Sequence, residues 1–245
     1  MFLDFPDFFP KNFKIKNHFL FRWSALKSEV VLTVSEYSKE RIQKHFGIDK
    51  IYVTHNAVDP FFLEPYNKTE AKNYIKSQFD MADFYLFVSR FEPRKNHFQL
   101  LKTFVENKHY LNKSLALVGN EALDCAAFDA YYNELVPEIK SKIKIFRKVN
   151  FKDLVMFTRA AELSVYPSVA EGFGIPPLES LAVETPTICS NTTAMADFDF
   201  LNDFLFDPMD GAQMNEKINL ALNYHNWAQV KQKMVEKYNW KNAAH

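Results

Sequence analysis

The stretch "SVAEGFGIPPLESLAVETPT", residues 168–187, contains two of the five glycines of the chain, Gly172 and Gly174. Pro176 and Pro177 follow shortly after the second glycine, and an apolar pattern with helical spacing continues from there. Glycines just before a helix let the backbone come close to a ligand, and proline suits the first helical turn, where its missing N–H costs nothing. The stretch therefore predicts a turn into a helix whose start can face a ligand.

Two carboxylates flank these glycines, with Glu171 in the turn and Glu179 in the first turn of the expected helix. Carboxylates accept hydrogen bonds from hydroxyl groups, so the pair suits a polyol such as ribose or a hexose. A plainer interpretation is that Glu179 only complements the helix dipole, a contribution of about 0.3–1 kcal/mol. Both interpretations remain open at this point.

Short apolar runs alternate with longer amphipathic segments along the rest of the chain. Strands are expected at 30–34, 51–54, 84–88, 115–118, 143–146, 163–166 and 187–189. Helices are expected at 36–46, 67–79, 96–108, 124–140, 151–160, 177–184 and 211–225. Several strands are apolar on both faces, as in a parallel sheet that helices cover on both sides. The alternation predicts an α/β fold with an open, doubly wound parallel sheet.

The alternation is interrupted at 56–70, "NAVDPFFLEPYNKTE", where prolines and polar residues predict a domain boundary. Residues 57–225 hold enough elements for a complete α/β domain, whereas residues 1–56 hold too few for an independent sheet of the usual size. Residues 1–56 are therefore expected to be the remnant of an N-terminal domain or an appendage on the main one. Residues 226–245 are expected to form a terminal helix that packs back toward the N-terminal part.

The composition argues against several classes of protein. Lysine plus arginine equals aspartate plus glutamate, 30 of each, so no attraction to nucleic acid is expected. The two cysteines and seven histidines fit no metal-ligand spacing. No segment approaches the roughly 18 apolar residues that span a bilayer, and the start of the chain is unlike a signal peptide. These features predict a soluble protein of a reducing compartment.

A second polar turn follows the expected strand at 84–88. Its sequence, "SRFEPRKNH", places Arg90, Arg94 and Lys95 just before an expected helix. In an open α/β sheet, ligands bind outside the carboxyl ends of the strands. Cations beside a helix N-terminus favour a phosphate or diphosphate there. The alternative is a solvated basic turn in which Glu92 is a local partner.

Together, the two turns resemble the donor-binding half of the retaining glycosyltransferases of the "glycosyl transferases group 1" family, which have the GT-B architecture. The family's R-x-x-x-x-K turn corresponds to Arg90 through Lys95. Its E-x-x-x-x-x-x-x-E motif corresponds to Glu171 through Glu179 in "PSVAEGFGIPPLE". Weaker similarities are "VLTVSEYSKERI", "HNAVD" and the terminal "YNWKNAA". The resemblance covers most of residues 28–243 and implies the Rossmann-like C-terminal half of a GT-B fold, with an incomplete N-terminal domain.

The resemblance also implies a role for each matched residue. Arg90 and Lys95 would bind the diphosphate of the donor and stabilise the charge that develops on it, a task that a metal performs in other sugar transferases. No metal or other cofactor is therefore expected. Glu171, the third expected catalytic residue beside Arg90 and Lys95, would hold the transferred sugar. Glu179 would hold the ribose. The backbone that helps to hold the sugar belongs to Gly172, Phe173 and Gly174.

The implied activity is transfer of a hexose, with retention of configuration, from a nucleoside-diphosphate sugar such as GDP-mannose or a UDP-sugar. The acceptor would be a glycan or a lipid-linked molecule in the synthesis of a surface polysaccharide such as lipopolysaccharide. The expected location is the cytoplasm, either free or peripheral at the inner face of the membrane. No nucleic-acid partner is expected.

The chain also departs from the family pattern. The glycine-rich loop and the sugar-contacting histidine of the family's first domain have no counterpart, and Ala57, Lys148 and Glu184 stand where the family has glycine. One alternative is therefore a truncated, non-catalytic domain that binds a nucleotide sugar or a partner. Another is an epimerase or a glycogen-phosphorylase-like relative, although no lysine has a recognisable pyridoxal-phosphate context. The incomplete first domain and the phenylalanine-rich start predict a homo-oligomer, or a partner chain that supplies the missing N-terminal half.

Overall fold

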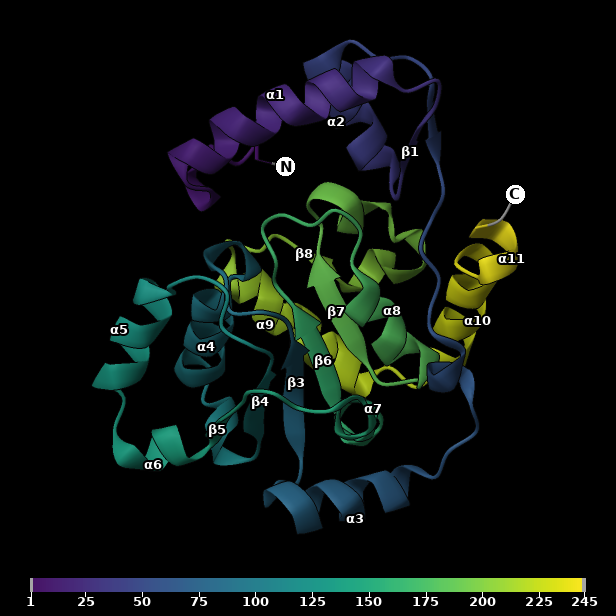
Figure 1. Cartoon of the computed structure of the whole chain (residues 1–245). Helices are drawn as coiled ribbons and strands as arrows, with labels where there is room; N and C mark the ends of the chain where they lie inside the picture. Colours follow the sequence, from purple (N-terminus) through teal and green to yellow (C-terminus); the bar gives the residue numbers. More distant parts are fainter. Residues whose placement is uncertain (1, 244–245) are drawn as a thin grey trace.

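The computed structural model describes residues 2–243, which form two parallel sheets with their helices (Figure 1). The small sheet consists of β1 (Val31–Thr33) and β2 (Ile51–Val53). The large sheet consists of β3 (Phe84–Val88), β4 (Ser114–Val118), β5 (Ile143–Phe146), β6 (Leu163–Tyr166), β7 (Thr187–Ser190) and β8 (Leu205–Phe206). The α-helices are α1 (Lys11–Lys27), α2 (Glu36–Phe46), α3 (Lys68–Phe79), α4 (His97–Glu106), α5 (Ala126–Glu134), α6 (Pro137–Ser141), α7 (Phe151–Ala160), α8 (Ile175–Ala182), α9 (Gly211–Asn223), α10 (Trp227–Lys237) and α11 (Trp240–Ala243).

The large sheet is parallel throughout, with the strand order β5-β4-β3-β6-β7-β8. The chain winds outward from β3 to β5 and then starts again at β6, on the other side of β3. The strand order therefore reverses between β3 and β6. In open α/β sheets, this reversal leaves a crevice at the carboxyl ends of the two strands, where ligands bind. The two polar turns singled out in the sequence follow these two strands, which confirms the predicted fold class and places both turns at the crevice.

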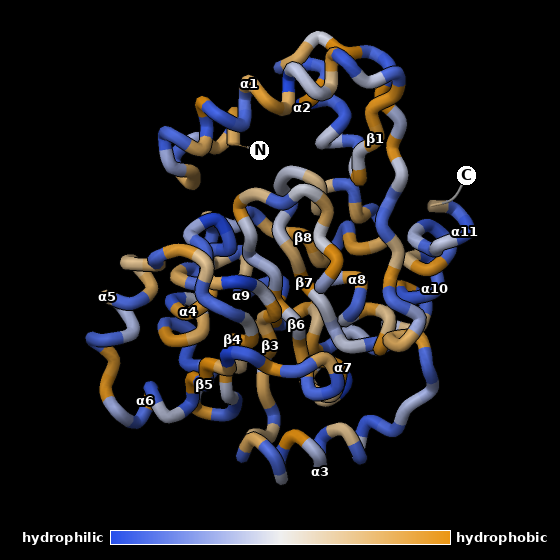
Figure 2. Tube along the Cα trace, in the orientation of Figure 1, coloured by the Kyte–Doolittle hydropathy of each residue, from blue (hydrophilic) through white to orange (hydrophobic). Residues whose placement is uncertain are grey.

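Helices cover both faces of the large sheet. Along β3, Phe84 and Leu86 belong to one apolar cluster with residues of α3 and α7. Tyr85 and Phe87 belong to another cluster, with residues of α4 and α9. Successive side chains of a strand point to opposite faces, so every position of this central strand is buried or nearly so. Figure 2 shows the resulting concentration of apolar residues along the central strands.

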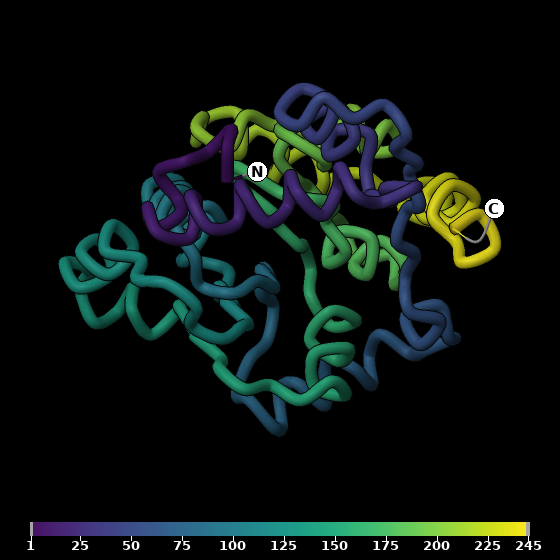
Figure 3. The backbone as a smooth tube through the Cα atoms, turned by 45° about the horizontal axis from the view of Figure 1, so that its top comes forward, coloured from purple at the N-terminus to yellow at the C-terminus, as the bar shows by residue number. Residues whose placement is uncertain are grey.

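The N-terminal part, from α1 to β2, lies above the carboxyl ends of the large sheet (Figures 1 and 3). Its helix α2 begins as the sequence predicts, since the N-cap Ser35 accepts a hydrogen bond from the backbone of Ser38. It ends before Gly47, whose φ of +67° is the left-handed conformation that glycine adopts without strain. α2 contacts a short 3₁₀ turn, Thr193–Asp197, of the larger part.

The longest helix, α1, is absent from the sequence-based expectation. Apolar residues occur on all its sides, so the 3.6-residue period that identifies a helix is missing. Its most exposed apolar side chains are Ile15, Phe19, Trp23 and Leu26. They are spaced three or four residues apart and therefore form one apolar stripe on the outer face of α1.

Two further elements differ from the expectation. The helix expected at 124–140 is divided into α5 and α6, because Pro137 forces the preceding Val136 into an extended conformation, with ψ of 154°. The short strand β8 was not expected. Within the terminal segment at 226–245, α10 packs on α8. Residues 1, 244 and 245 lie outside the described part of the chain, and the domain limits remain a prediction.

Two of the three positions at which the resemblance implies glycine adopt the left-handed conformation, with φ of +58° at Lys148 and +55° at Glu184. A residue with a Cβ atom is less stable there than glycine by about 1–2 kcal/mol. The third position, Ala57, is not among the described residues with positive φ. Lys148 and Glu184 therefore lower the stability of the chain locally, and the chain adopts the fold nonetheless.

Lys148→Gly is expected to raise the free energy of unfolding by about 0.5–1 kcal/mol, because relief of the backbone strain exceeds the extra chain entropy of glycine. Lys142→Gly is the matched control, since φ is −85° at that position. It should lower the same free energy by about 0.5–1 kcal/mol. Urea denaturation of the two variants measures both values, and a loss of stability in Lys148→Gly would contradict the expectation.

Candidate active site

The first half of the site is the turn after β3. Pro93 begins a 3₁₀ turn that ends at Lys95, and Asn96, with φ of +61°, joins this turn to α4. The Asn96 side chain donates a hydrogen bond to the backbone oxygen of Pro208 at 2.7 Å. This contact fixes the turn against the segment before α9. In this turn the Arg90 side chain is 64% exposed, whereas that of Lys95 is 14% exposed.

The second half is the turn after β6, where the glycine pair lies. The backbone nitrogen of Glu171 donates to Thr193 Oγ1 at 2.9 Å. The backbone oxygen of Gly172 accepts a hydrogen bond from Ser35 Oγ at 2.8 Å, so the N-terminal part holds this turn directly. Gly174, with φ of +107°, turns the chain into α8, a conformation that favours glycine. The turn is therefore fixed from two sides before it reaches the helix.

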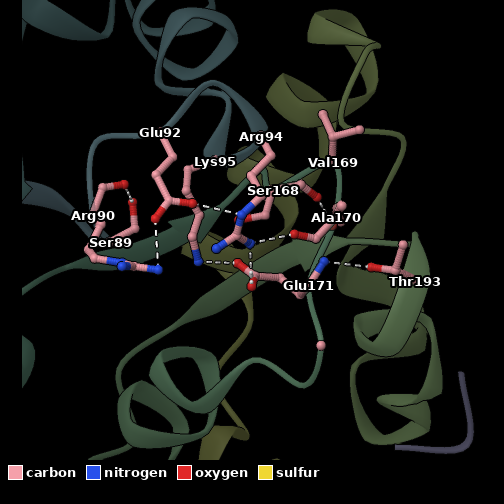
Figure 4. Close-up of polar contacts among 12 residues, drawn as sticks. Ser89, Arg90, Glu92, Arg94, Lys95, Ser168, Val169, Ala170, Glu171 and Thr193 are labelled. Carbon is pink, nitrogen blue, oxygen red and sulfur yellow. Dashed lines mark hydrogen bonds and ion pairs between the residues drawn. The ribbon is translucent and has the colours of Figure 1, made fainter. Parts of the chain in front are cut away.

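An ionic network joins the two turns (Figure 4). Glu92 accepts from Arg90 Nη2 at 2.8 Å and from Arg94 Nε at 2.7 Å. Arg94 Nη1 lies 3.1 Å from Glu171 Oε2, and Lys95 Nζ is the partner of Glu171 Oε1. Three cations thus meet two carboxylates, and the network retains one net positive charge. That balance favours an anionic ligand.

A cavity of about 210 Å³ lies beside this network, between the ends of β3 and β6. Four of the predicted site residues line it, namely Lys95, Glu171, Phe173 and Gly174. Gly172 lies in the same turn as the last three. The other residues around the cavity include Asn56, Ser89, Tyr166, Ser168, Pro177 and Met195. The cavity therefore combines a mostly apolar wall with a cation and a carboxylate.

Glu179 lies on α8 and is not among the residues that line this cavity. Burial raises the pKa of its carboxyl to about 7, and the nearby Asp59 acts in the same direction. Among residues 2–243, none donates a hydrogen bond to this carboxylate or forms an ion pair with it. The side chain is half-buried, so its free carboxylate can take a hydrogen-bond donor from a ligand. The geometry is thus compatible with the expected contact to a hydroxyl, which stays a prediction.

The two arginines of the first turn differ in their surroundings. Arg90, to which the resemblance assigns a diphosphate contact, does not line the cavity, and its one charged partner among residues 2–243 is Glu92. Arg94, to which the resemblance assigns no role, has a side chain only 11% exposed and contacts Glu171 directly. The structure thus brings Lys95 and Glu171 together and leaves Arg90 at the rim. The catalytic assignments themselves remain predictions.

Sequence reasoning missed Asn56, Ser89 and Ser168 as cavity residues, although Asn56 belongs to the noted "HNAVD".

It also missed a second hollow of about 330 Å³, formed mainly by the loop after β4. Gly119 starts that loop, and a Cβ atom there would lie 1.9 Å from the backbone oxygen of Ser89. Since β4 neighbours β3 in a parallel sheet, its carboxyl end was a signal that could have revealed this hollow. The lining residues are Phe91, Glu121, Ala122, Leu123, Asp124, Cys125, Asp129 and Arg147.

Two features of residues 2–243 concern metal ions and membranes. No three histidine, cysteine, aspartate or glutamate side chains in this part of the chain come close enough together to hold a metal ion. Over the same residues, none of the helices has both the length and the apolar character that crossing a bilayer would require.

Comparison with known proteins gives family models that match most of the chain. The model described as "Glycosyl transferases group 1" matches residues 68–239, and the one described as "Glycosyltransferase Family 4" matches residues 1–61. The O-antigen chain mannosyltransferase RfbU of Salmonella typhimurium is 32% identical over 191 residues, which are 76% of this chain and 49% of that protein. The O-antigen chain mannosyltransferase B of Escherichia coli is 27% identical over 210 residues, 83% of this chain and 54% of the relative. The chain thus spans about half the length of these relatives.

Solved structures resemble the fold at lower identity. Anabaena Alr3699/HepE in complex with UDP-glucose aligns with a TM-score of 0.79 and 14% identity, over 96% of this chain and 67% of that one. A glycosyltransferase from Rickettsia africae ESF-5 aligns with a TM-score of 0.74 and 20% identity, over 96% of this chain and 65% of that one. The fold of the chain is thus that of GT-B glycosyltransferases.

Proposed function

Because the chain belongs to the glycosyl transferases group 1 family, we propose that it transfers a hexose from a nucleoside-diphosphate sugar, with retention of configuration. The donor would be GDP-mannose or a UDP-sugar. The acceptor would be a glycan or a lipid-linked molecule in the synthesis of a surface polysaccharide. The observation that carries the proposal is the pairing of Lys95 with Glu171 at the reversal of strand order. A phosphate-binding cation and an acceptor for sugar hydroxyls therefore lie at one cavity.

In this proposal, the charges of the network replace a metal. When the glycosidic bond breaks, negative charge develops on the leaving diphosphate, and fixed cations stabilise it in a site of low water content. Lys95 already lines the cavity. Arg90 would turn from Glu92 toward the diphosphate, a movement that its exposed position at the rim permits. Glu171 would accept hydrogen bonds from the hydroxyls of the transferred sugar, and Glu179 from those of the ribose.

The relatives support the choice of donor and pathway. Two of them are named as O-antigen chain mannosyltransferases, which agrees with a mannose donor and a surface polysaccharide product. A structure with the same fold holds UDP-glucose, which agrees with a nucleotide-sugar donor. A location in the cytoplasm, either free or at the inner face of the membrane, would follow from such a role.

One observation favours a second function. The chain spans only 49% of the length of the Salmonella relative, so the surface that recognises the acceptor can be incomplete in this chain. In that case the chain would bind a nucleotide sugar or a partner without transferring the sugar. Donor binding is common to both functions, and transfer separates them.

A transfer assay therefore tests the proposal. The purified chain would be incubated with labelled GDP-mannose or UDP-glucose and a panel of oligosaccharide and lipid-linked acceptors. The proposal predicts release of free nucleotide in step with glycoside formation, and an α-linked product from the α-linked donor by NMR. A β-linked product would overturn retention. Donor binding without transfer to any acceptor would favour the non-catalytic function.

We also propose that a second copy of the chain packs on the exposed stripe of α1. Exposed apolar patches of this kind mark interaction sites in soluble proteins. At high protein concentration, light scattering should give a mass above the 28.7 kDa of a single chain. The double variant Phe19→Ser/Trp23→Ser should return the mass to that of a monomer. A monomeric mass for the unaltered chain at the same concentration would contradict the prediction.

A further inference from the structure

Arg94 is the most buried cation of the site and makes more contacts there than the residues that the family motif identifies. Its Nη1 donates to the backbone oxygen of Ala170 at 2.7 Å and to Glu171 Oε2 at 3.1 Å. Its Nε lies 2.7 Å from Glu92 Oε2. In the reverse direction, the backbone nitrogen of Val169 donates to the backbone oxygen of Arg94 at 2.8 Å. One residue of the first turn thus holds three consecutive residues of the second turn (Figure 4).

Two cations contact the Glu171 carboxylate, and they differ in how firmly their own side chains are held. Oε2 is held by the Arg94 guanidinium, which is itself fixed by Glu92 and Ala170. Oε1 is held by Lys95, whose ammonium group makes no other hydrogen bond or ion pair among the described residues. A lysine side chain is a flexible point charge, whereas a guanidinium with several partners is fixed in orientation. Lys95 is therefore the cation that can exchange partners.

We infer that Arg94 is a positioning residue, which keeps Glu171 in place for the transferred sugar when Lys95 turns to the diphosphate of the donor. This inference rests on the proposed function. A diphosphate that draws Lys95 away leaves Glu171 with one charged partner, Arg94, so the carboxylate neither loses its counter-ion nor moves out of the cavity. Lysine at position 94 has no planar fork and cannot bond Glu92, Ala170 and Glu171 at once.

Replacement of Arg94 should lower affinity only for ligands that carry the sugar. This selectivity distinguishes a positioning role from a direct contact with the phosphates. A nucleoside diphosphate has no hexose for Glu171 to hold, whereas the nucleotide sugar has one. Loss of Arg94 should therefore weaken binding of GDP-mannose or UDP-glucose while binding of GDP or UDP changes little. A misplaced hydrogen-bond partner corresponds to about a tenfold loss of affinity.

The test compares calorimetric affinities for GDP with GDP-mannose, and for UDP with UDP-glucose, in the unaltered chain and four variants. Arg94→Lys and Arg94→Gln should each lose about tenfold or more for the nucleotide sugar and less than about threefold for the nucleotide. The double variant Arg94→Gln/Glu92→Gln replaces the buried ion pair by a neutral pair and keeps the test valid if a single variant does not fold. Arg90→Met is the control, which should weaken both ligands by the same factor.

Each outcome decides the inference. A selective loss for the nucleotide sugar in the Arg94 variants supports it. Equal losses for both ligands would assign Arg94 to the phosphates, and no loss would leave it without a role at the site, so either result overturns the inference alone. If the unaltered chain binds none of the four ligands, the proposed function fails, and the inference fails with it.

Discussion

Glu179→Gln should raise the free energy of unfolding by about 3 kcal/mol at pH 8 and leave it nearly unchanged at pH 4. Burial raises the pKa of this carboxyl from 4.5 to about 7 in the folded chain. Between these two values the folded state binds more protons than the unfolded state, so stability falls as the pH rises. Above pH 7 the full penalty of about 3 kcal/mol is present, and below pH 4.5 both states are protonated and it disappears. Glutamine has the same shape without the charge and removes the penalty.

Urea denaturation between pH 4 and pH 8 measures this effect. Glu216→Gln, on the exposed side of α9, is the matched control and should give a curve parallel to that of the unaltered chain. A parallel curve for Glu179→Gln would show that the carboxyl is not desolvated, and the account of Glu179 would be wrong.

The same variant should weaken nucleotide binding by about 1–3 kcal/mol, because the ribose then lacks a charged acceptor. A position that costs stability and serves binding is typical of a functional site.

Lys95→Ala should lower the affinity for the nucleoside diphosphate by about 100-fold, since a hydrogen bond to a charged group contributes about 1.5–3 kcal/mol. The fold should survive this change. Glu171 keeps Arg94 as a partner at 3.1 Å, so no buried carboxylate is left without a counter-ion. Calorimetric titration with the nucleotide that the unaltered chain binds would measure the loss.

Lys102→Ala serves as the control for Lys95→Ala. Lys102 lies on α4, the helix that follows the turn of Lys95; its side chain is 39% exposed and pairs with Glu106 at the surface. Its removal should change nucleotide affinity by less than about threefold, because a solvent-exposed charge is largely screened. A comparable loss in both variants would mean that the lysines act only through general electrostatic attraction, and Lys95 would have no specific role.

The alternation of strands and helices could be predicted from the sequence, apart from β8, because several strands of the large sheet are apolar on both faces. The position of Lys95 near Glu171 followed from that pattern, since both residues lie in the turns that follow neighbouring parallel strands. α1 could not be predicted in the same way. Its apolar residues surround the helix, and this pattern has no period to detect.

The orientation of the Arg90 and Arg94 side chains also could not be predicted from the sequence. Arg90 and Arg94 carry the same charge and lie four residues apart, and the sequence does not distinguish the exposed Arg90 from the buried Arg94. The left-handed conformations of Lys148 and Glu184 could not be predicted either, because lysine and glutamate rarely adopt a positive φ, whereas glycine often does. Such features depend on the packed structure around the turn.

Calorimetric titration of the purified chain with GDP, UDP and ADP, in the presence of a chelator, would show whether this chain has a nucleotide site. If the cavity between β3 and β6 is a donor site, one of the three nucleotides should bind with a dissociation constant in the micromolar range, and Lys95→Ala should abolish most of that affinity. The bound nucleotide would then identify the base of the donor. If none of the three binds, the two turns do not form a nucleotide-sugar site in this chain, and the claim is contradicted.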